Sequence, residues 1–187
     1  MGKKFNFFKE AVKNYKTLGT VVPSSRYLAE RMLKSIDFSN EIVIVELGPG
    51  NGAITHKILK NLSPKSTLIC FEINDVFYNE LVKIKNEQLI VLKASAEKIT
   101  TELQKLGIAK TNYVISSLPL TILPKELSTT ILEQCYKSLK ADGLFIQYQY
   151  NLSYYRRLKS VFKTVLLDFE PLNFPPAFVY RCKKQTD

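Results

Sequence analysis

A short apolar, β-branched run followed at once by a glycine-rich turn is the feature that most restricts how this chain can fold. The run is Glu41–Leu47, and the turn is Gly48-Pro49-Gly50-Asn51-Gly52. Continuous apolarity is typical of a strand buried on both faces, as in a parallel sheet. Glycines let the backbone turn tightly and let a ligand approach the main chain. A helix predicted from the turn to about Leu62 would add unpaired N–H groups. The sequence therefore predicts a strand, a ligand-binding loop and a helix in succession.

Strand and helix patterns alternate along the rest of the chain, which indicates an α/β fold with a mostly parallel sheet. After a helix at Arg26–Ile36, further strands are predicted at Thr67–Ile73, Leu89–Lys93, Asn112–Ser116, Leu144–Tyr150, Val165–Phe169 and Phe178–Cys182. Helices are predicted at Val76–Lys85, Ala96–Leu106, Pro124–Leu139 and 153–163, with Ala141-Asp142-Gly143 ending the third of these four.

Composition and charge exclude several classes of protein. A length of 187 residues suits one ordinary domain, and no apolar run is long enough to span a bilayer. The chain has no recognisable secretory signal, and its three separated cysteines favour a reduced, cytoplasmic protein. The single histidine, His56, excludes a multi-histidine metal site and disfavours a Ser-His-Asp triad, so no metal is predicted.

The net charge of +10 is concentrated at the two ends of the chain. Residues 1–20 and 153–187 each contribute +4, whereas residues 21–152 contribute +2. Such an excess attracts nucleic acid or an anionic membrane surface, although solvated lysine-rich faces explain it equally well.

Two carboxylates sharpen the interpretation of the glycine turn. Glu72 follows Gly52 by twenty residues, at the end of the second predicted strand, where a carboxylate would accept hydrogen bonds from ribose hydroxyls. Glu46 places negative charge just before the turn, which disfavours a pyrophosphate and favours a ligand with a cationic amine or sulfonium. A bare glycine-rich loop suits any nucleotide, or no ligand at all.

The pattern E-x-G-x-G-x-G resembles motif I of the class I S-adenosylmethionine-dependent methyltransferases. The resemblance implies a Rossmann-like, seven-stranded, mostly parallel sheet with helices on both faces. It implies S-adenosylmethionine as cofactor and S-adenosylhomocysteine as product. Glu46 would lie near the methionine amine and Glu72 would hold the ribose, while Ser95 stands where an adenine-binding Asp is common. The implied cofactor-binding residues are Glu46, Gly48, Gly50, Gly52, Glu72, Ser95, Ala96 and Ser116.

The end of the fourth predicted strand bears on the methyl acceptor. Adenine methyltransferases carry Asn-(Leu/Pro)-Pro-(Tyr/Phe) at this point, where the amide binds the exocyclic amine and the aromatic ring stacks on the base. This chain has Ser117 in place of the amide and Leu120 in place of the aromatic residue. The sequence ends soon after the seventh predicted strand, so we do not expect the additional helical domain of ribosomal RNA adenine dimethyltransferases. A nucleic-acid adenine N-methyltransferase is therefore the less favoured alternative.

Four stretches together are similar to the soluble, Rossmann-type bacterial phospholipid N-methyltransferases. They are residues 18–25, 117–120, 147–150 and 173–177. The likeness covers about Phe5 to Tyr180 and implies stepwise methylation of phosphatidylethanolamine at the membrane surface. Close relatives methylate the amine of ornithine lipids, and the residues do not separate the two head groups. A third interpretation is a cofactor-fold protein that has lost catalysis; Ser95 favours it, and the intact glycines and carboxylates oppose it.

The N-terminal segment has the composition of a helix lying in a membrane interface. We divide the chain into this basic amphipathic helix, residues 1–20, and a methyltransferase domain, residues 21–187. The residues expected to contact an anionic membrane are Lys4, Phe5, Phe8, Lys9, Val12 and Tyr15. The alternative is an amphipathic helix packed on the domain. With the family likeness, we expect a cytoplasmic protein peripheral to the inner face of the membrane.

The resemblance leaves the catalytic groups to be identified. Methyl transfer needs an acceptor lone pair about 3 Å from the methyl carbon, so a protonated lipid amine must first lose a proton. With no well-placed histidine base, we expect water to take the proton while backbone carbonyls at 116–118 and tyrosine hydroxyls hold the amine. Aromatic faces also bind a cationic, methylated amine. The candidates are Ser117, Tyr148 and Tyr150; alternate tyrosines on a strand are equally well explained as packing residues.

Overall fold

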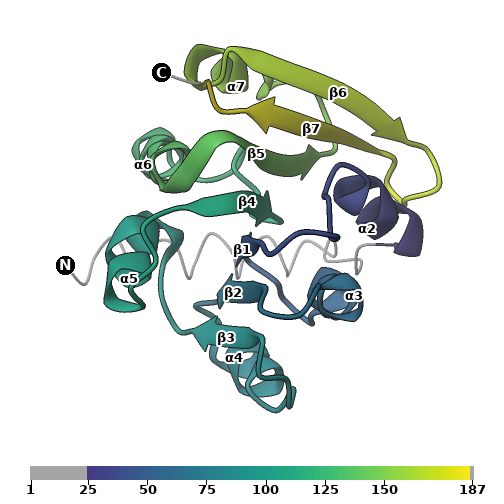
Figure 1. Cartoon of the computed structure of the whole chain (residues 1–187). Coiled ribbons are helices and arrows are strands. Elements are labelled where there is room, and N and C mark those ends of the chain that lie inside the picture. Colours follow the sequence, from purple (N-terminus) through teal and green to yellow (C-terminus); the bar gives the residue numbers. More distant parts are fainter. Residues whose placement is uncertain (1–24, 186–187) are drawn as a thin grey trace.

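The computed structural model describes residues 25–185, in which seven strands form one sheet with the order β3-β2-β1-β4-β5-β7-β6 (Figure 1). The first five strands are parallel, and β7 lies antiparallel between β5 and β6. The strands are β1 (Val43–Leu47), β2 (Thr67–Phe71), β3 (Leu89–Leu92), β4 (Thr111–Ser116), β5 (Leu139–Gln149), β6 (Thr164–Glu170) and β7 (Ala177–Lys183).

Helices cover both faces of this sheet, because successive strand residues point to opposite sides. On one face Val45 and Phe145 pack with residues of α5, α6 and α7, and on the other Ile44 and Ile146 pack with residues of α2 and α3. The helices are α2 (Arg26–Leu33), α3 (Ala53–Asn61), α4 (Asp75–Leu81), the 3₁₀ helix η1 (Ala96–Lys98), α5 (Ile99–Lys105), α6 (Lys125–Ser138) and α7 (Tyr155–Val161). The predicted α/β class, seven-stranded sheet and two helical layers are confirmed.

The start of β5 differs from the prediction. The strand begins at Leu139, directly after α6, so Ala141-Asp142-Gly143 lies within β5 and does not separate helix from strand. Asp142 has a φ of 59°, and the register with β4 shifts between Thr111 and Tyr113. A Cβ on Gly143 would lie 3.0 Å from two backbone carbonyl oxygens. Residues 141–143 therefore form an irregularity inside a strand. At position 143 a side chain would crowd the two carbonyl oxygens, so the position favours glycine.

Several helices are also shorter than predicted: α2 ends at Leu33 instead of Ile36, α6 loses one residue at each end, and α7 covers Tyr155–Val161 instead of 153–163. The helix expected at Val76–Lys85 ends at Leu81, and the one expected at Ala96–Leu106 is divided into η1 and α5. Within residues 25–185, no helix combines the length and apolarity needed to cross a membrane. The predicted helix at residues 1–20, with all six proposed membrane contacts, lies outside the described residues and stays a prediction.

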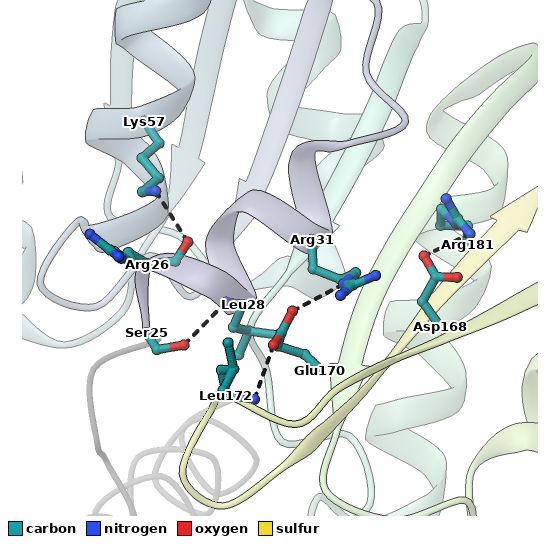
Figure 2. A network of polar contacts seen from close by, with 9 residues as sticks. All are labelled: Ser25, Arg26, Leu28, Arg31, Lys57, Asp168, Glu170, Leu172 and Arg181. Atoms are coloured by element: carbon teal, nitrogen blue, oxygen red, sulfur yellow. Dashed lines mark hydrogen bonds and ion pairs between the residues drawn. The ribbon is translucent and has the colours of Figure 1, made fainter.

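The described chain begins beside the hairpin that joins β6 to β7. The Ser25 N–H donates to Asn173 Oδ1 at 3.1 Å, and the Ser25 hydroxyl accepts from the Leu28 N–H to cap α2. Figure 2 shows Arg31 of α2 donating to Glu170 at the end of β6. The other oxygen of Glu170 accepts from the Leu172 N–H. The N-terminus of α2 is thus attached to the hairpin at the carboxyl edge of the parallel strands.

Candidate functional site

The glycine loop follows β1, which lies between β2 and β4. Gly48, Gly50 and Gly52 have φ values of 65°, 58° and 81°, and residues with a Cβ adopt this left-handed region at a cost of roughly 1–2 kcal/mol. The Gly48 N–H donates to the Phe71 carbonyl at 3.0 Å, which joins the loop to the end of β2. Gly52 then caps α3. The backbone of the loop therefore requires the glycines of the motif.

The space around the loop differs from one glycine to the next. A Cβ on Gly48 would lie 2.7 Å from Leu118 Cδ2, so the loop packs directly on the segment after β4 at this point. At Gly50 the nearest atom would be Phe77 Cε2 at 3.9 Å, an ordinary contact distance. The loop is therefore closed against the protein at Gly48 and open at Gly50, which suits a ligand lying on the Gly50 side.

Glu72 connects the first two loops of the sheet edge. One of its carboxylate oxygens accepts from the Gly50 N–H at 3.2 Å, and the other accepts from the Asn74 N–H at 2.7 Å. The residue is buried at the end of β2. A carboxylate oxygen has lone pairs for more than one donor, so Glu72 retains acceptor capacity for ribose hydroxyls beside the glycine loop.

Glu46 lies fully buried beneath the loop, on the face of the sheet that carries α3. Its Oε2 accepts from the Thr55 hydroxyl at 2.7 Å and from the Cys70 thiol at 3.4 Å. Its Oε1 has no hydrogen-bond partner in residues 25–185. Burial raises the pKa of this carboxyl to about 7, against the lowering effect of the Thr55 and Cys70 hydrogen bonds. A cationic amine is the kind of group that would complete this environment.

The proposed adenine contacts lie after β3. The Ser95 hydroxyl caps η1 by accepting from the Glu97 N–H, and it also donates to the Glu97 carboxylate at 3.2 Å. Ser95 and Ala96 are both buried. The acidic group absent at position 95 is thus present two residues later, in contact with Ser95.

The proposed acceptor segment follows β4. The Ser117 N–H donates to the Leu47 carbonyl at 2.9 Å, and the buried Ser116 hydroxyl accepts from the Leu118 N–H at 3.3 Å. Ser117 is partly exposed, whereas Leu120 is buried. The structure therefore brings Ser116 and Ser117 next to the end of β1 and the glycine loop.

Two buried glutamines on β5 were not selected from the sequence as site residues. Gln147 Nε2 donates to the Leu118 carbonyl at 3.0 Å, and Gln149 accepts from the Thr121 hydroxyl at 3.3 Å. Gln147 Oε1 and Gln149 Nε2 have no partner in the described part of the chain. Their alternate spacing, directly after the apolar residues Leu144, Phe145 and Ile146, is the signal that could have identified them as holding the acceptor segment.

Tyr148 points to the opposite face of β5 from the two glutamines, because it alternates with them along the strand. Tyr150 directly follows the strand and packs against the same cluster as Tyr148. Both are partly buried against the layer that contains α2, and their ring centroids are 5.7 Å apart. Burial raises the pKa of Tyr150, helped by the neighbouring Tyr148, while a hydrogen bond involving Asn173 opposes the rise. The structure thus groups these tyrosines with the β6–β7 hairpin, and their proposed catalytic role stays a prediction.

The fold is that of a class I S-adenosylmethionine-dependent methyltransferase. The model of the family described as ribosomal RNA adenine dimethylase matches residues 13–162, and the chain belongs to this family. It is also 30% identical over 183 residues to an ornithine lipid N-methyltransferase of Singulisphaera acidiphila, with 96% of this chain and 95% of that protein covered.

Solved structures support the fold. A precorrin-6y C5,15-methyltransferase of Geobacter metallireducens is 12% identical with a TM-score of 0.68, and 89% of this chain and 92% of that one are covered. A 1,6-didemethyltoxoflavin-N1-methyltransferase of Burkholderia thailandensis, with bound S-adenosylhomocysteine, is 13% identical with a TM-score of 0.68 and coverages of 96% and 87%. The predicted class and its cofactor, S-adenosylmethionine, are confirmed.

Proposed function

We propose that the enzyme methylates the amine of a lipid head group at a membrane surface. The head group is phosphatidylethanolamine or its methylated forms, or an ornithine lipid. The observation that carries this proposal is the match to an ornithine lipid N-methyltransferase, which extends over nearly the full length of both chains. On this proposal the protein works as a peripheral protein on the cytoplasmic face of the membrane.

The segment after β4 supports a lipid amine over adenine. The family description favours adenine in ribosomal RNA as the second candidate. Adenine chemistry, however, uses a side-chain amide and an aromatic ring in this segment. Ser117 has no amide, and Leu120 is buried and has no aromatic ring to offer a base.

The cofactor would lie along the glycine loop. In this arrangement the backbone of Gly48, Gly50 and Gly52 passes beneath it, Glu72 accepts from the ribose hydroxyls, and Ser95 and Ala96 border the adenine. Glu46 and Ser116 border the methionine end. When bound, S-adenosylmethionine supplies the electrophilic methyl group on its sulfonium.

The residues after β4 and on β5 would position the neutral amine of the substrate for attack on the methyl group. The carbonyls of 116–118 can accept from its N–H groups, and Gln147 holds the segment by its bond to the Leu118 carbonyl. Water takes the proton from the amine. Ser117, Tyr148 and Tyr150 are the side chains proposed to contact the substrate, the tyrosines through a hydroxyl or through a cation–π contact with the methylated amine.

Expression in a bacterial host that lacks methylated lipids tests the proposal. With both phosphatidylethanolamine and ornithine lipid present, mass spectrometry should detect mono-, di- or trimethylated forms of one of them. A Glu72→Gln variant with reduced cofactor binding serves as the control. Methylated adenine in ribosomal RNA with unchanged lipids would refute the lipid proposal and favour the second candidate.

Single tyrosine substitutions test the proposed contacts. Tyr148→Phe and Tyr150→Phe keep the aromatic face and remove the hydroxyl. If the hydroxyl holds the amine, kcat on lipid vesicles falls while cofactor affinity stays unchanged. Unchanged kcat for both variants would remove the hydroxyls from the mechanism.

A further inference from the structure

Exposed apolar side chains gather in the loops at the carboxyl edge of the sheet. Single exposed apolar residues are normal on any protein, so their placement is what matters. The ten large apolar side chains that are exposed in residues 25–185 include five that follow the carboxyl end of a strand. These are Val76 after β2, Ile122 after β4, Leu152 after β5, and Leu172 and Phe174 after β6.

The hairpin between β6 and β7 is the most exposed part of this group. Leu172 is 63% exposed and Phe174 is 80% exposed. Because β6 pairs antiparallel with β7, and β7 antiparallel with β5, the tip of this hairpin lies at the same edge as the glycine loop. Figure 1 shows the hairpin tip beside α2. The hydrogen bonds of Ser25 and Arg31 to the hairpin hold it there.

Positive charge accompanies these apolar side chains. Three helices begin at this edge with an exposed basic residue near the start: Arg26 of α2, Lys125 of α6 and Arg156 of α7. Exposed Asp75 and Glu126 lie there too, but Asp75 forms an ion pair with Lys93. Aromatic and aliphatic side chains with surrounding basic residues are the combination that binds an anionic bilayer.

We propose that this carboxyl edge is a bilayer-docking surface, defined by Val76, Ile122, Leu152, Leu172 and Phe174. It inserts these side chains among the head groups of an anionic membrane. The inference rests on the proposed function: the amine of a membrane lipid stays at the bilayer surface, so the edge that holds the methyl donor must face that surface. The docking surface lies wholly in residues 25–185 and is separate from the predicted helix at residues 1–20.

Two double variants of the full chain test this surface. Leu172→Ser with Phe174→Ser removes the apolar side chains of the hairpin. Val82→Ser with Leu106→Ser is the matched control, because these residues are also exposed but end α4 and α5 at the opposite edge. Thermal melting and cofactor calorimetry would report whether the hairpin variant folds. If it does not fold, Ile122→Ser with Leu152→Ser repeats the test on the loops after β4 and β5.

The probe is sedimentation with vesicles of phosphatidylcholine and phosphatidylglycerol. We expect the hairpin variant to bind about tenfold more weakly than the wild type, since each buried apolar side chain contributes substantially to partitioning, and the control variant to bind as the wild type does. Methylation of a short-chain lipid amine below its micelle concentration should be unchanged in both. Methylation of the same amine in vesicles should fall only in the hairpin variant.

The outcomes separate this inference from the proposed function. Wild-type sedimentation of both the hairpin variant and the loop variant overturns the docking surface, even if lipids are methylated. Loss of self-association in these variants with unchanged sedimentation also overturns it and assigns the edge to contact between two copies of the chain. Weaker sedimentation together with no methylation of any lipid amine by the wild type supports the docking surface and refutes the proposed function.

Discussion

Replacing Glu46 with Gln should change how the stability of the protein depends on pH. Glu46 is the fully buried carboxyl beneath the glycine loop, and Oε1 lacks a partner in the described residues. Burial raises its pKa from the ordinary value of 4.5 to about 7. Gln has nearly the same shape and can still accept from Thr55, but it carries no charge at any pH. The substitution therefore removes the titration and leaves the packing in place.

The magnitude follows from linkage between protonation and folding. Below its unfolded pKa, Glu46 is protonated in both states and adds no pH dependence. As the pH rises from about 4.5 to about 7, the unfolded chain releases the proton while the folded protein retains it, so the free energy of unfolding falls. At about 1.36 kcal/mol for each tenfold change in proton affinity, the full loss is about 3 kcal/mol. Above about pH 7 both states are ionised and the loss is complete.

Urea denaturation between about pH 4 and about pH 8 would measure this loss. The wild type should lose about 3 kcal/mol of stability from this group, and Glu46→Gln should lose that much less over the same range. Glu41→Gln, at an exposed position just before β1, is the matched control and should behave as the wild type does. Parallel stability curves for the wild type and Glu46→Gln would refute the reasoning.

Calorimetry of cofactor binding extends the same test to the ligand. If the methionine amine lies near Glu46, the ionised carboxylate favours binding, so wild-type affinity for S-adenosylmethionine should increase as the pH rises towards 7. The amine itself stays protonated in this range. Glu46→Gln should show a flat dependence. A steep dependence that survives in the variant would show that another group is responsible and would place the amine elsewhere.

Three further changes have defined outcomes. Gly48→Ala should destabilise the protein by about 1 kcal/mol more than Gly50→Ala, since both strain a left-handed backbone but only the first forces a close contact; urea denaturation would check this. Glu72→Gln should weaken S-adenosylmethionine binding about tenfold in calorimetry, through weaker acceptance from ribose hydroxyls, and equal affinity would contradict the ribose role. Arg31→Met should cost about 1–3 kcal/mol by unpairing the buried Glu170, whereas an unchanged melting temperature would show that the ion pair does not hold the hairpin.

The parts of the fold that depend on local patterns were predictable. The run before Gly48 and the glycines themselves specify a buried strand and a left-handed turn, and the position of Glu72 follows from the spacing of one strand–helix–strand unit. The start of β5 was not predictable in this way. The sequence Asp142-Gly143 is typical of a turn. In the structure it lies inside β5, where the carbonyl oxygens of Asn112 and Lys140 leave little room for a side chain at position 143.

The least predictable part of the site is the support of the acceptor segment. Gln147 and Leu118 are 29 positions apart, and their hydrogen bond depends on β4 and β5 being neighbours in the sheet. Alternation on β5 showed that glutamines and tyrosines face opposite sides, but it did not show which side faces the acceptor segment. The sequence suggested Tyr148 and Tyr150 as substrate contacts, because aromatic rings bind cations. In the structure Gln147 and Gln149 form hydrogen bonds with the segment after β4, whereas the tyrosines pack against the layer that contains α2.

The close contact between Gly48 and Leu118 connects the two halves of the proposed reaction. The donor loop belongs to β1 and the acceptor segment to β4, and methyl transfer requires reacting atoms about 3 Å apart. A residue larger than glycine at position 48 would displace the Leu118 side chain, since even a Cβ would lie 2.7 Å from Leu118 Cδ2. Gln147 Nε2 donates to the backbone carbonyl of the same Leu118 residue. On the proposed function, Gln147 holds the acceptor segment through the Leu118 carbonyl, so Gln147→Ala should reduce kcat more than cofactor affinity.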